Sequence, residues 1–288
     1  MPPARLTAER DSPFPADFPS AGAVMGRAGG ENFPVAARFL PRELRGHLLA
    51  IYGFARLVDQ LGDEAPGDRA ALLDELEADL DRVYAGEPRR PVLAPLVATV
   101  REFDLPREPF LALIAANRQD QVVSRYATYD ELAAYCTLSA DPVGRLVLGI
   151  LRAASPERIA LSDRICTALQ LAEHWQDVAE DHARGRIYLP QEDMARFGVS
   201  EADLSGCQTP GRVRELLVFE VARARGLLDE GRPLVRTLSG WGRVAVAGYV
   251  GGGYAALDAI RRTGYDVLAG PPQASKPAMA LAALRELR

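Results

Sequence analysis

The chain has 288 residues and a formal net charge of −5, and 48% of its residues are hydrophobic while 25% are charged. This length supplies a substantial core for one large domain or two small ones, and the composition excludes disordered, collagen-like and disulfide-stapled chains. The negative net charge also argues against nucleic-acid binding, because it gives no general attraction to phosphate polymers.

Helical periodicity dominates the chain after an aperiodic start. Residues 1–30 are rich in Pro, Gly and Ala and are predicted to form a mobile N-terminal arm, whereas residues 31–288 are expected to form a single domain. The predicted helices, in chain order, are 41–58, 69–85, 91–103, 107–124, 129–153, 156–184, 191–197, 210–229, 241–262 and 277–287. Strand signals are nearly absent, so the predicted fold class is all-α.

Local signals set several of these boundaries. Asp68 is a predicted N-cap, and Ser155 followed by Pro156 is a second helix start. Gly86 is expected to end the helix that Asp68 begins. The helix over 129–153 is expected to bend or break at Asp141, because a residue before proline avoids the helical conformation.

The cysteines and the apolar segments indicate an intracellular protein. Three cysteines lie far apart without a C-x-x-C pair, which is typical of reduced proteins: Cys136, Cys166 and Cys207. The N-terminus lacks the apolar run of a signal peptide. The longest uncharged stretch, 244–257, has 14 residues, whereas a membrane-spanning helix needs about 20. We therefore expect a cytoplasmic protein, which an apolar substrate would bring to the inner face of the membrane as a peripheral protein.

Several kinds of chemistry lack their motifs in this sequence. There are three histidines and no H-E-x-x-H, which argues against a zinc hydrolase. No G-x-S-x-G element is present. The glycines at 251–253 follow no predicted strand and match neither a dinucleotide fingerprint nor a P-loop, so we expect them to serve close helix packing.

Two predicted helices carry acidic residues at intervals of four. The first acidic group is Asp59 and Asp63, with Arg56 one turn upstream, and the second acidic group is Glu173, Asp177 and Asp181. Like charges at this spacing cost about 0.2–0.5 kcal/mol per pair on an isolated helix, so a cation is expected nearby. One interpretation is a solvated face neutralised by arginines such as Arg184 and Arg186.

The alternative counter-ion is Mg²⁺, which prefers carboxylate oxygens and keeps positions for water and phosphate. Two acidic groups on long apolar helices favour this interpretation over the solvated face. If the groups face each other, metal ions between them would hold a diphosphate, and Arg56 would contact a phosphate oxygen directly.

The motifs around both groups resemble those of the squalene/phytoene synthase family. They are Tyr52-x3-Arg56-x2-Asp59-x3-Asp63, Tyr135-Cys136-x2-Ser139-Ala140-x2-Val143-Gly144, Gln170-x6-Asp177-x3-Asp181, and Gly185-Arg186-x-Tyr188-Leu189-Pro190. The resemblance runs from about Asn32 to Leu268. It implies a single-domain helical isoprenoid synthase fold with a central cavity and with Mg²⁺ between the two acidic groups.

The resemblance also implies roles for individual residues. The metal ligands would be Asp59, Asp63, Glu173, Asp177 and Asp181, and the catalytic set would be Asp59, Asp63, Asp177, Asp181, Tyr52 and Arg56. The substrate-binding residues would be Asn32, Tyr52, Arg56, Tyr135, Gln170, Gln176, Arg186 and Tyr188. The sequence departs from the family pattern at Glu173, where an amide is usual, and at Gln60, where an acid is common. It also has Gly29-Gly30 where the family often has His-Ser or His-Tyr.

Two further segments resemble one branch of the family. They are E-N-F-P-V-A at 31–36 and H-W-Q-D-V-A-E-D at 174–181. That branch converts presqualene diphosphate to hydroxysqualene in bacterial hopanoid biosynthesis, by ionisation, rearrangement of a cyclopropylcarbinyl cation and capture by water. The expected apolar tunnel would be lined by helix faces that include Phe54, Leu138, Val143 and Leu171.

Two other functions remain open at this point. In the first, the protein condenses two prenyl diphosphates to presqualene diphosphate, squalene or phytoene. In the second, it is a helical scaffold of the same fold that has lost catalysis. The scaffold is disfavoured because a site that no longer binds a cation would not be expected to keep mutually repelling carboxylates. All four aspartates are present, namely Asp59, Asp63, Asp177 and Asp181. The sequence leaves chain-length specificity and the oligomeric state open.

Overall fold

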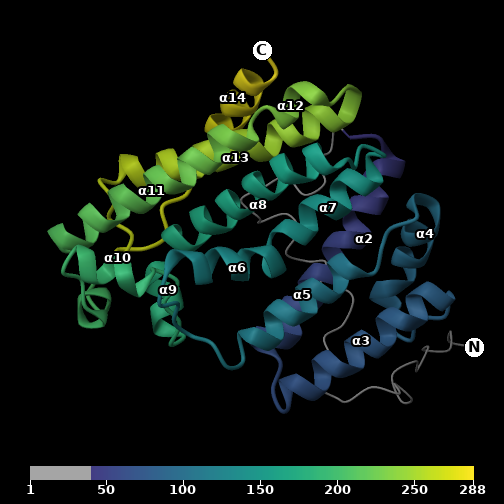
Figure 1. The fold of residues 1–288 in the computed structure, drawn as a ribbon, viewed down its shortest axis with the longest axis horizontal. Helices are drawn as coiled ribbons and strands as arrows, with labels where there is room; N and C mark the ends of the chain where they lie inside the picture. The colour runs from purple at the N-terminus through teal and green to yellow at the C-terminus, as the bar shows by residue number, and fades with distance from the viewer. Residues whose placement is uncertain (1–39) are drawn as a thin grey trace, which may run out of the picture.

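The computed structural model describes residues 40–288, and these residues form an all-helical domain (Figure 1). Residues 1–39, which include the predicted arm and Asn32, lie outside the described part. Between residues 40 and 288 there is no strand, and Arg125 and Ile187 form one isolated bridge. The predicted fold class is therefore confirmed.

The helices follow one another with short connections. The longer ones are α2 (Arg42–Asp59), α3 (Arg69–Ala85), α4 (Ala94–Phe103), α5 (Glu108–Gln119), α6 (Tyr129–Ser139), α7 (Asp141–Ile150), α8 (Pro156–Gln176), α11 (Gly211–Gly231), α13 (Gly240–Arg262) and α14 (Lys276–Glu286). The shorter ones are the π-helical turn η1 (Gln60–Glu64), η2 (Pro91–Leu93), α9 (Val178–Ala183), α10 (Gln191–Arg196), η3 (Glu201–Leu204) and α12 (Leu234–Thr237).

The predicted boundary signals are confirmed. The Asp68 carboxylate accepts a hydrogen bond from the backbone N–H of Ala71 at 3.0 Å, and the Ser155 hydroxyl accepts one from the N–H of Arg158 at 3.4 Å. Gly86 adopts a left-handed conformation, with φ of 95°, at the end of α3. These caps satisfy backbone groups that a helix end leaves without partners.

The segment 129–153 divides at Ala140 into α6 and α7, at the expected break. Three features differ from the prediction. The segment 156–184 divides at Asp177, whose φ and ψ of −99° and 15° depart from the helix. The helix predicted over 107–124 ends at Gln119. The short elements η3 and α12 were not predicted, because three or four residues show no periodicity.

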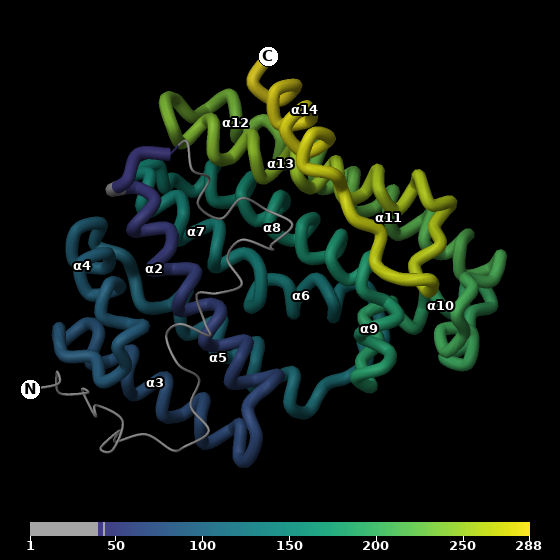
Figure 2. The backbone as a smooth tube through the Cα atoms, turned by 180° about the vertical axis from the view of Figure 1, so that it is seen from behind, coloured from purple at the N-terminus to yellow at the C-terminus, as the bar shows by residue number. Residues whose placement is uncertain are grey.

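Two apolar clusters form the core. One gathers side chains from α2 to α5 and α7, and the other gathers side chains from α6, α8, α11 and α13. The ribbon shows the corresponding arrangement, with α2 to α5 on one side, α11, α13 and α14 on the other, and α6 to α8 between them (Figures 1 and 2). In residues 40–288, no helix combines the length and the apolar character needed to cross a bilayer.

Candidate active site

A cavity of about 490 Å³ lies between the two sides of the domain, and both acidic groups line it. Along α2 and α8 the cavity-facing side chains change from apolar to acidic in the direction of the chain. The apolar part is lined by Leu48, Ile51, Val143, Val147, Leu148, Ile165, Leu169, Leu234 and Val246. The cavity thus combines a hydrocarbon-binding surface with a carboxylate-rich end.

The first acidic group lies where α2 passes into η1. The Arg186 guanidinium lies 2.7 Å from Asp63, and the Arg56 guanidinium lies 3.0 Å from Glu64 and 3.8 Å from Asp59. Burial alone would lower the pKa of Arg186, but the Asp63 carboxylate outweighs it and the pKa is raised. Arginines therefore neutralise much of this group's charge.

Gly62 brings η1 close to α5. A Cβ atom at Gly62 would overlap the side-chain amide of Asn117, and that amide donates a hydrogen bond to Asp59 at 3.4 Å. Gln121 donates to the Gly62 carbonyl at 3.0 Å. The small residue at 62 thus lets α5 approach closely enough for Asn117 to hold the Asp59 carboxylate of α2.

The second acidic group continues across the interruption between α8 and α9. The N–H of Asp177 bonds to the carbonyl of Glu173 at 2.9 Å, and the N–H of Asp181 bonds to the carbonyl of Asp177 at 2.8 Å. The four-residue repeat is therefore kept, and all three carboxylates line the cavity. Burial, and then the neighbouring Asp181, raise the pKa of Asp177 to about 6.

An aromatic wall connects the two groups. The His174 ring stacks on Tyr188 with ring centroids 3.7 Å apart, and its Nε2 lies 3.3 Å from the Gln170 amide nitrogen. The Tyr135 hydroxyl donates a hydrogen bond to Asp120 at 2.8 Å. Burial raises the pKa of Asp120 to about 6.

Sequence reasoning missed Asp120 and His174 as cavity residues. Asp120 follows α5 with no partner at helical spacing, and its link to Tyr135 exists only because α5 packs on α6. His174 lies inside the second motif, four residues after Gln170, and this spacing is the signal that would have found it.

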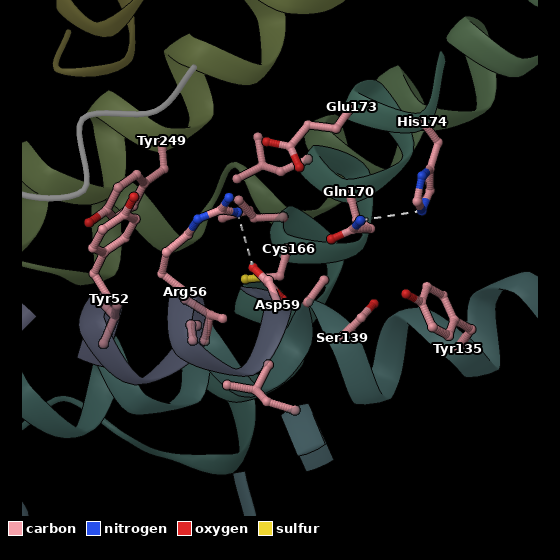
Figure 3. A pocket seen from close by; sticks show the side chains of 18 of the residues that line it. Tyr52, Arg56, Asp59, Tyr135, Ser139, Cys166, Gln170, Glu173, His174 and Tyr249 are labelled. Atoms are coloured by element: carbon pink, nitrogen blue, oxygen red, sulfur yellow. Dashed lines mark hydrogen bonds and ion pairs between the residues drawn. The ribbon is translucent and has the colours of Figure 1, made fainter. Parts of the chain in front are cut away.

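The cavity gathers most of the predicted site residues, as Figure 3 shows for several of them. Those that line it are Tyr52, Arg56, Asp59, Asp63, Tyr135, Gln170, Glu173, Asp177, Asp181, Arg186 and Tyr188. Gln176 is not among them, because its side chain is 2% exposed and donates to the carbonyl of Pro272 behind α8. Asn32 lies outside the described residues.

The predicted tunnel residues separate into lining and core. Val143 lines the cavity. Phe54 and Leu171 are fully buried in the two apolar clusters, so their prediction as tunnel walls is wrong. Leu138 packs against the second cluster and does not line the cavity. Helical periodicity identifies apolar faces, but it does not distinguish packed faces from those that border a cavity.

The donor set of the cavity suits a hard divalent cation. All five predicted ligands carry carboxylate oxygens and line the same space. Within the part of the chain that the structure describes, no three His, Cys, Asp or Glu side chains form a metal-binding cluster. The five carboxylates line the cavity as two separate groups, one on α2 and η1 and the other on α8 and α9.

Comparisons with known proteins agree with this architecture. The squalene/phytoene synthase family matches residues 27–278. A phytoene synthase from Arthrospira platensis is 36% identical over 70% of this chain and 71% of its own length. A hydroxysqualene synthase from Zymomonas mobilis is 34% identical over 69% of this chain and 67% of its own. The crystal structure of squalene synthase HpnC from Alicyclobacillus acidocaldarius is 47% identical, with a TM-score of 0.78 over 84% of this chain and 92% of that one.

Proposed function

The chain belongs to the squalene/phytoene synthase family, and we propose that it converts presqualene diphosphate to hydroxysqualene in squalene and hopanoid biosynthesis, with Mg²⁺ and with release of diphosphate. Hydroxysqualene synthases from two bacteria, at 34% identity each, support the reaction type. The structure of HpnC, at 47% identity, supports a substrate that leads to squalene-type products.

The observation that carries the proposal is the position of both acidic groups at one end of a cavity whose remainder is largely apolar. A substrate with a diphosphate head and a long hydrocarbon body has the same two-part character. Carboxylates alone would repel a diphosphate, so the acidic end is suited to the substrate only together with cations. Arg56, Arg184 and Arg186 supply some of that positive charge at the cavity wall.

Ionisation is the step that this arrangement favours. The bond between carbon and the diphosphate oxygen breaks, and both electrons leave with the diphosphate. Bound Mg²⁺ would neutralise the negative charge that develops there. Arg56 and Arg186 stabilise the same charge through charge-assisted hydrogen bonds. Tyr52, Tyr135, Gln170 and Tyr188 contact the substrate where the polar and apolar parts of the cavity meet.

The apolar part of the cavity then protects the cation. The cyclopropylcarbinyl cation rearranges, and a water oxygen forms the new C–O bond. The released diphosphate takes the proton that this water loses. The product is a tertiary alcohol, and no reductant is required. The walls formed by Ile51, Val143 and Leu169 limit the access of other water molecules.

A second reaction is supported by the comparisons. Phytoene synthases are as similar to this chain as hydroxysqualene synthases are, with identities of 36% and 34%. Condensation of two prenyl diphosphates would use the same ionisation of a diphosphate ester at the same acidic end. The two reactions differ in substrate, so product analysis separates them.

The test is incubation of the purified protein with Mg²⁺ and presqualene diphosphate, followed by mass spectrometry of the products. We expect a C30 alcohol and free diphosphate. A parallel incubation with farnesyl diphosphate alone is expected to give no condensed product. A condensed C30 product there would replace the proposal with a condensation, and consumption of neither substrate would favour a non-catalytic scaffold.

A further inference from the structure

The two arginines nearest the first acidic group are engaged with carboxylates. Arg186 forms a 2.7 Å ion pair with Asp63, and their side chains are 17% and 36% exposed. Arg56 reaches Asp59 and Glu64 (Figure 3 draws its pair with Asp59). Arg184 also lines the cavity, but no described carboxylate lies within ion-pair distance of its guanidinium.

These pairs conflict with the roles that the proposed function gives to the same residues. A divalent cation needs the Asp63 oxygens, and a diphosphate needs the Arg186 guanidinium. Asp63 cannot give the same lone pairs to both cations at full strength. Moreover, Arg186 is largely buried, so losing Asp63 without a replacement would leave a poorly solvated charge.

We propose that Arg186 exchanges partners, pairing with Asp63 when no ligand is bound and with the diphosphate once a metal ion has taken Asp63. This inference rests on the proposed function, since it requires a divalent cation and a diphosphate at the same end of the cavity. The metal frees the guanidinium for the diphosphate, and the diphosphate compensates the guanidinium for the lost carboxylate. Each ligand therefore raises the affinity for the other, by the same factor.

Arg186 is a diphosphate-binding residue in this account, and its removal has opposite effects on the two ligands. In Arg186→Gln, Mg²⁺ alone no longer has to break an ion pair, so it binds more tightly. Inorganic pyrophosphate in the presence of Mg²⁺ loses a guanidinium and binds more weakly. The factor by which Mg²⁺ strengthens pyrophosphate binding therefore decreases.

Isothermal titration calorimetry measures these quantities without turnover. The titrations are Mg²⁺ alone, pyrophosphate alone, and pyrophosphate at saturating Mg²⁺. For Arg186→Gln we expect Mg²⁺ alone to bind about three- to tenfold more tightly, and the coupling factor to fall about tenfold, as for loss of one charge-assisted contact.

Arg184→Gln is the matched control, because it removes the same charge from the same cavity without removing an ion pair with a described carboxylate. It reports the effect of charge alone, and the change in Mg²⁺ affinity in Arg186→Gln must exceed it at least about threefold. Arg186→Lys keeps the charge without the bidentate fork and is expected to fall between wild type and Arg186→Gln. It also serves as the test if Arg186→Gln does not fold.

The outcomes separate this inference from the proposed function. Equal changes in Arg184→Gln and Arg186→Gln, or an unchanged coupling factor in Arg186→Gln, overturn the exchange while the function stands. A wild-type protein that binds pyrophosphate with no dependence on Mg²⁺ removes the premise of the proposed function itself.

Discussion

The two acidic groups share a spacing in the sequence but differ in their electrostatic surroundings. Asp63 of the first group is paired with Arg186 at 2.7 Å. In the second group, Asp181 lies 3.9 Å from the His174 ring, and the pKa of Asp177 is raised to about 6 by burial and by Asp181. Asp63 of the first group is thus neutralised by a guanidinium, whereas the adjacent Asp177 and Asp181 of the second group repel each other, and a bound cation would relieve that repulsion.

The difference follows from what packs against each group. The connector between α9 and α10 carries Arg186 back across the cavity to η1. In the second group, Asp181 lies beside the His174 ring, which stacks on Tyr188. Aromatic rings are weak partners for carboxylates compared with guanidinium groups. A sequence motif therefore fixes the ligand types, while neighbouring elements determine how strongly they need a metal.

The largest expected effect is on turnover. Asp63→Asn and Asp177→Asn should each lower kcat with presqualene diphosphate by about 100-fold or more, because each removes a carboxylate from the charge-stabilising end. Steady-state diphosphate release measures this. A loss confined to one variant would show that only one group takes part in the chemistry.

The same two variants should change stability in opposite directions. Asp177→Asn relieves repulsion with Asp181 and should raise Tm by about 1–3 °C, whereas Asp63→Asn leaves the largely buried Arg186 guanidinium without its carboxylate and should lower Tm by about 2–6 °C. Thermal denaturation without divalent metal gives both values. If both variants shift Tm in the same direction, the contrast between the groups is wrong.

Metal binding should require the second group as well as Asp63. Millimolar Mg²⁺ should raise the Tm of the wild-type protein by about 2–4 °C, since a ligand that binds only the folded state stabilises it. The increase should be lost in Asp177→Asn. Chelation by EDTA is the control and should return the wild-type Tm to its metal-free value.

The pH dependence of stability tests Asp120, a cavity carboxylate that belongs to neither acidic group. Asp120 has its pKa raised from 3.8 to about 6 by burial, so the folded state binds its proton more tightly than the unfolded state does. Its contribution to stability is therefore greatest at low pH, decreases as pH rises from about 4 to 6, and stays low above that range.

Asp120→Asn removes this dependence while keeping an acceptor for the Tyr135 hydroxyl. The Tm of the variant relative to wild type should rise by about 2–5 °C between pH 4.5 and pH 7. Parallel melting curves at both pH values provide the measurement. A Tm difference that does not change with pH would contradict the assigned pKa direction.

The smallest effect is expected at Glu173. The resemblance places an amide at this position, and two further carboxylates follow it in the second group. Glu173→Gln should therefore change kcat less than about tenfold, because the amide still offers an oxygen ligand and two carboxylates remain in the group. A loss as large as that of Asp177→Asn would make Glu173 an indispensable ligand in this chain.

Local patterns in the sequence determined the helical class, most helix boundaries and the two acidic groups. These signals act within one or two helical turns, so they can be identified from the sequence alone. Examples are the Asp68 cap, the break before Pro142 and the four-residue spacing of the acids. The resemblance to the squalene/phytoene synthase family rested on the same motifs, and the comparisons confirm it.

Only the tertiary structure decided which of these residues meet. It paired Asp63 with Arg186 and Tyr135 with Asp120, it turned Gln176 away from the cavity, and it placed Phe54 in the core. Such relations depend on how helices distant in the chain cross and pack. A helical repeat gives the direction of a side chain around its own axis, but the neighbour on that side is set by the packing of the whole domain.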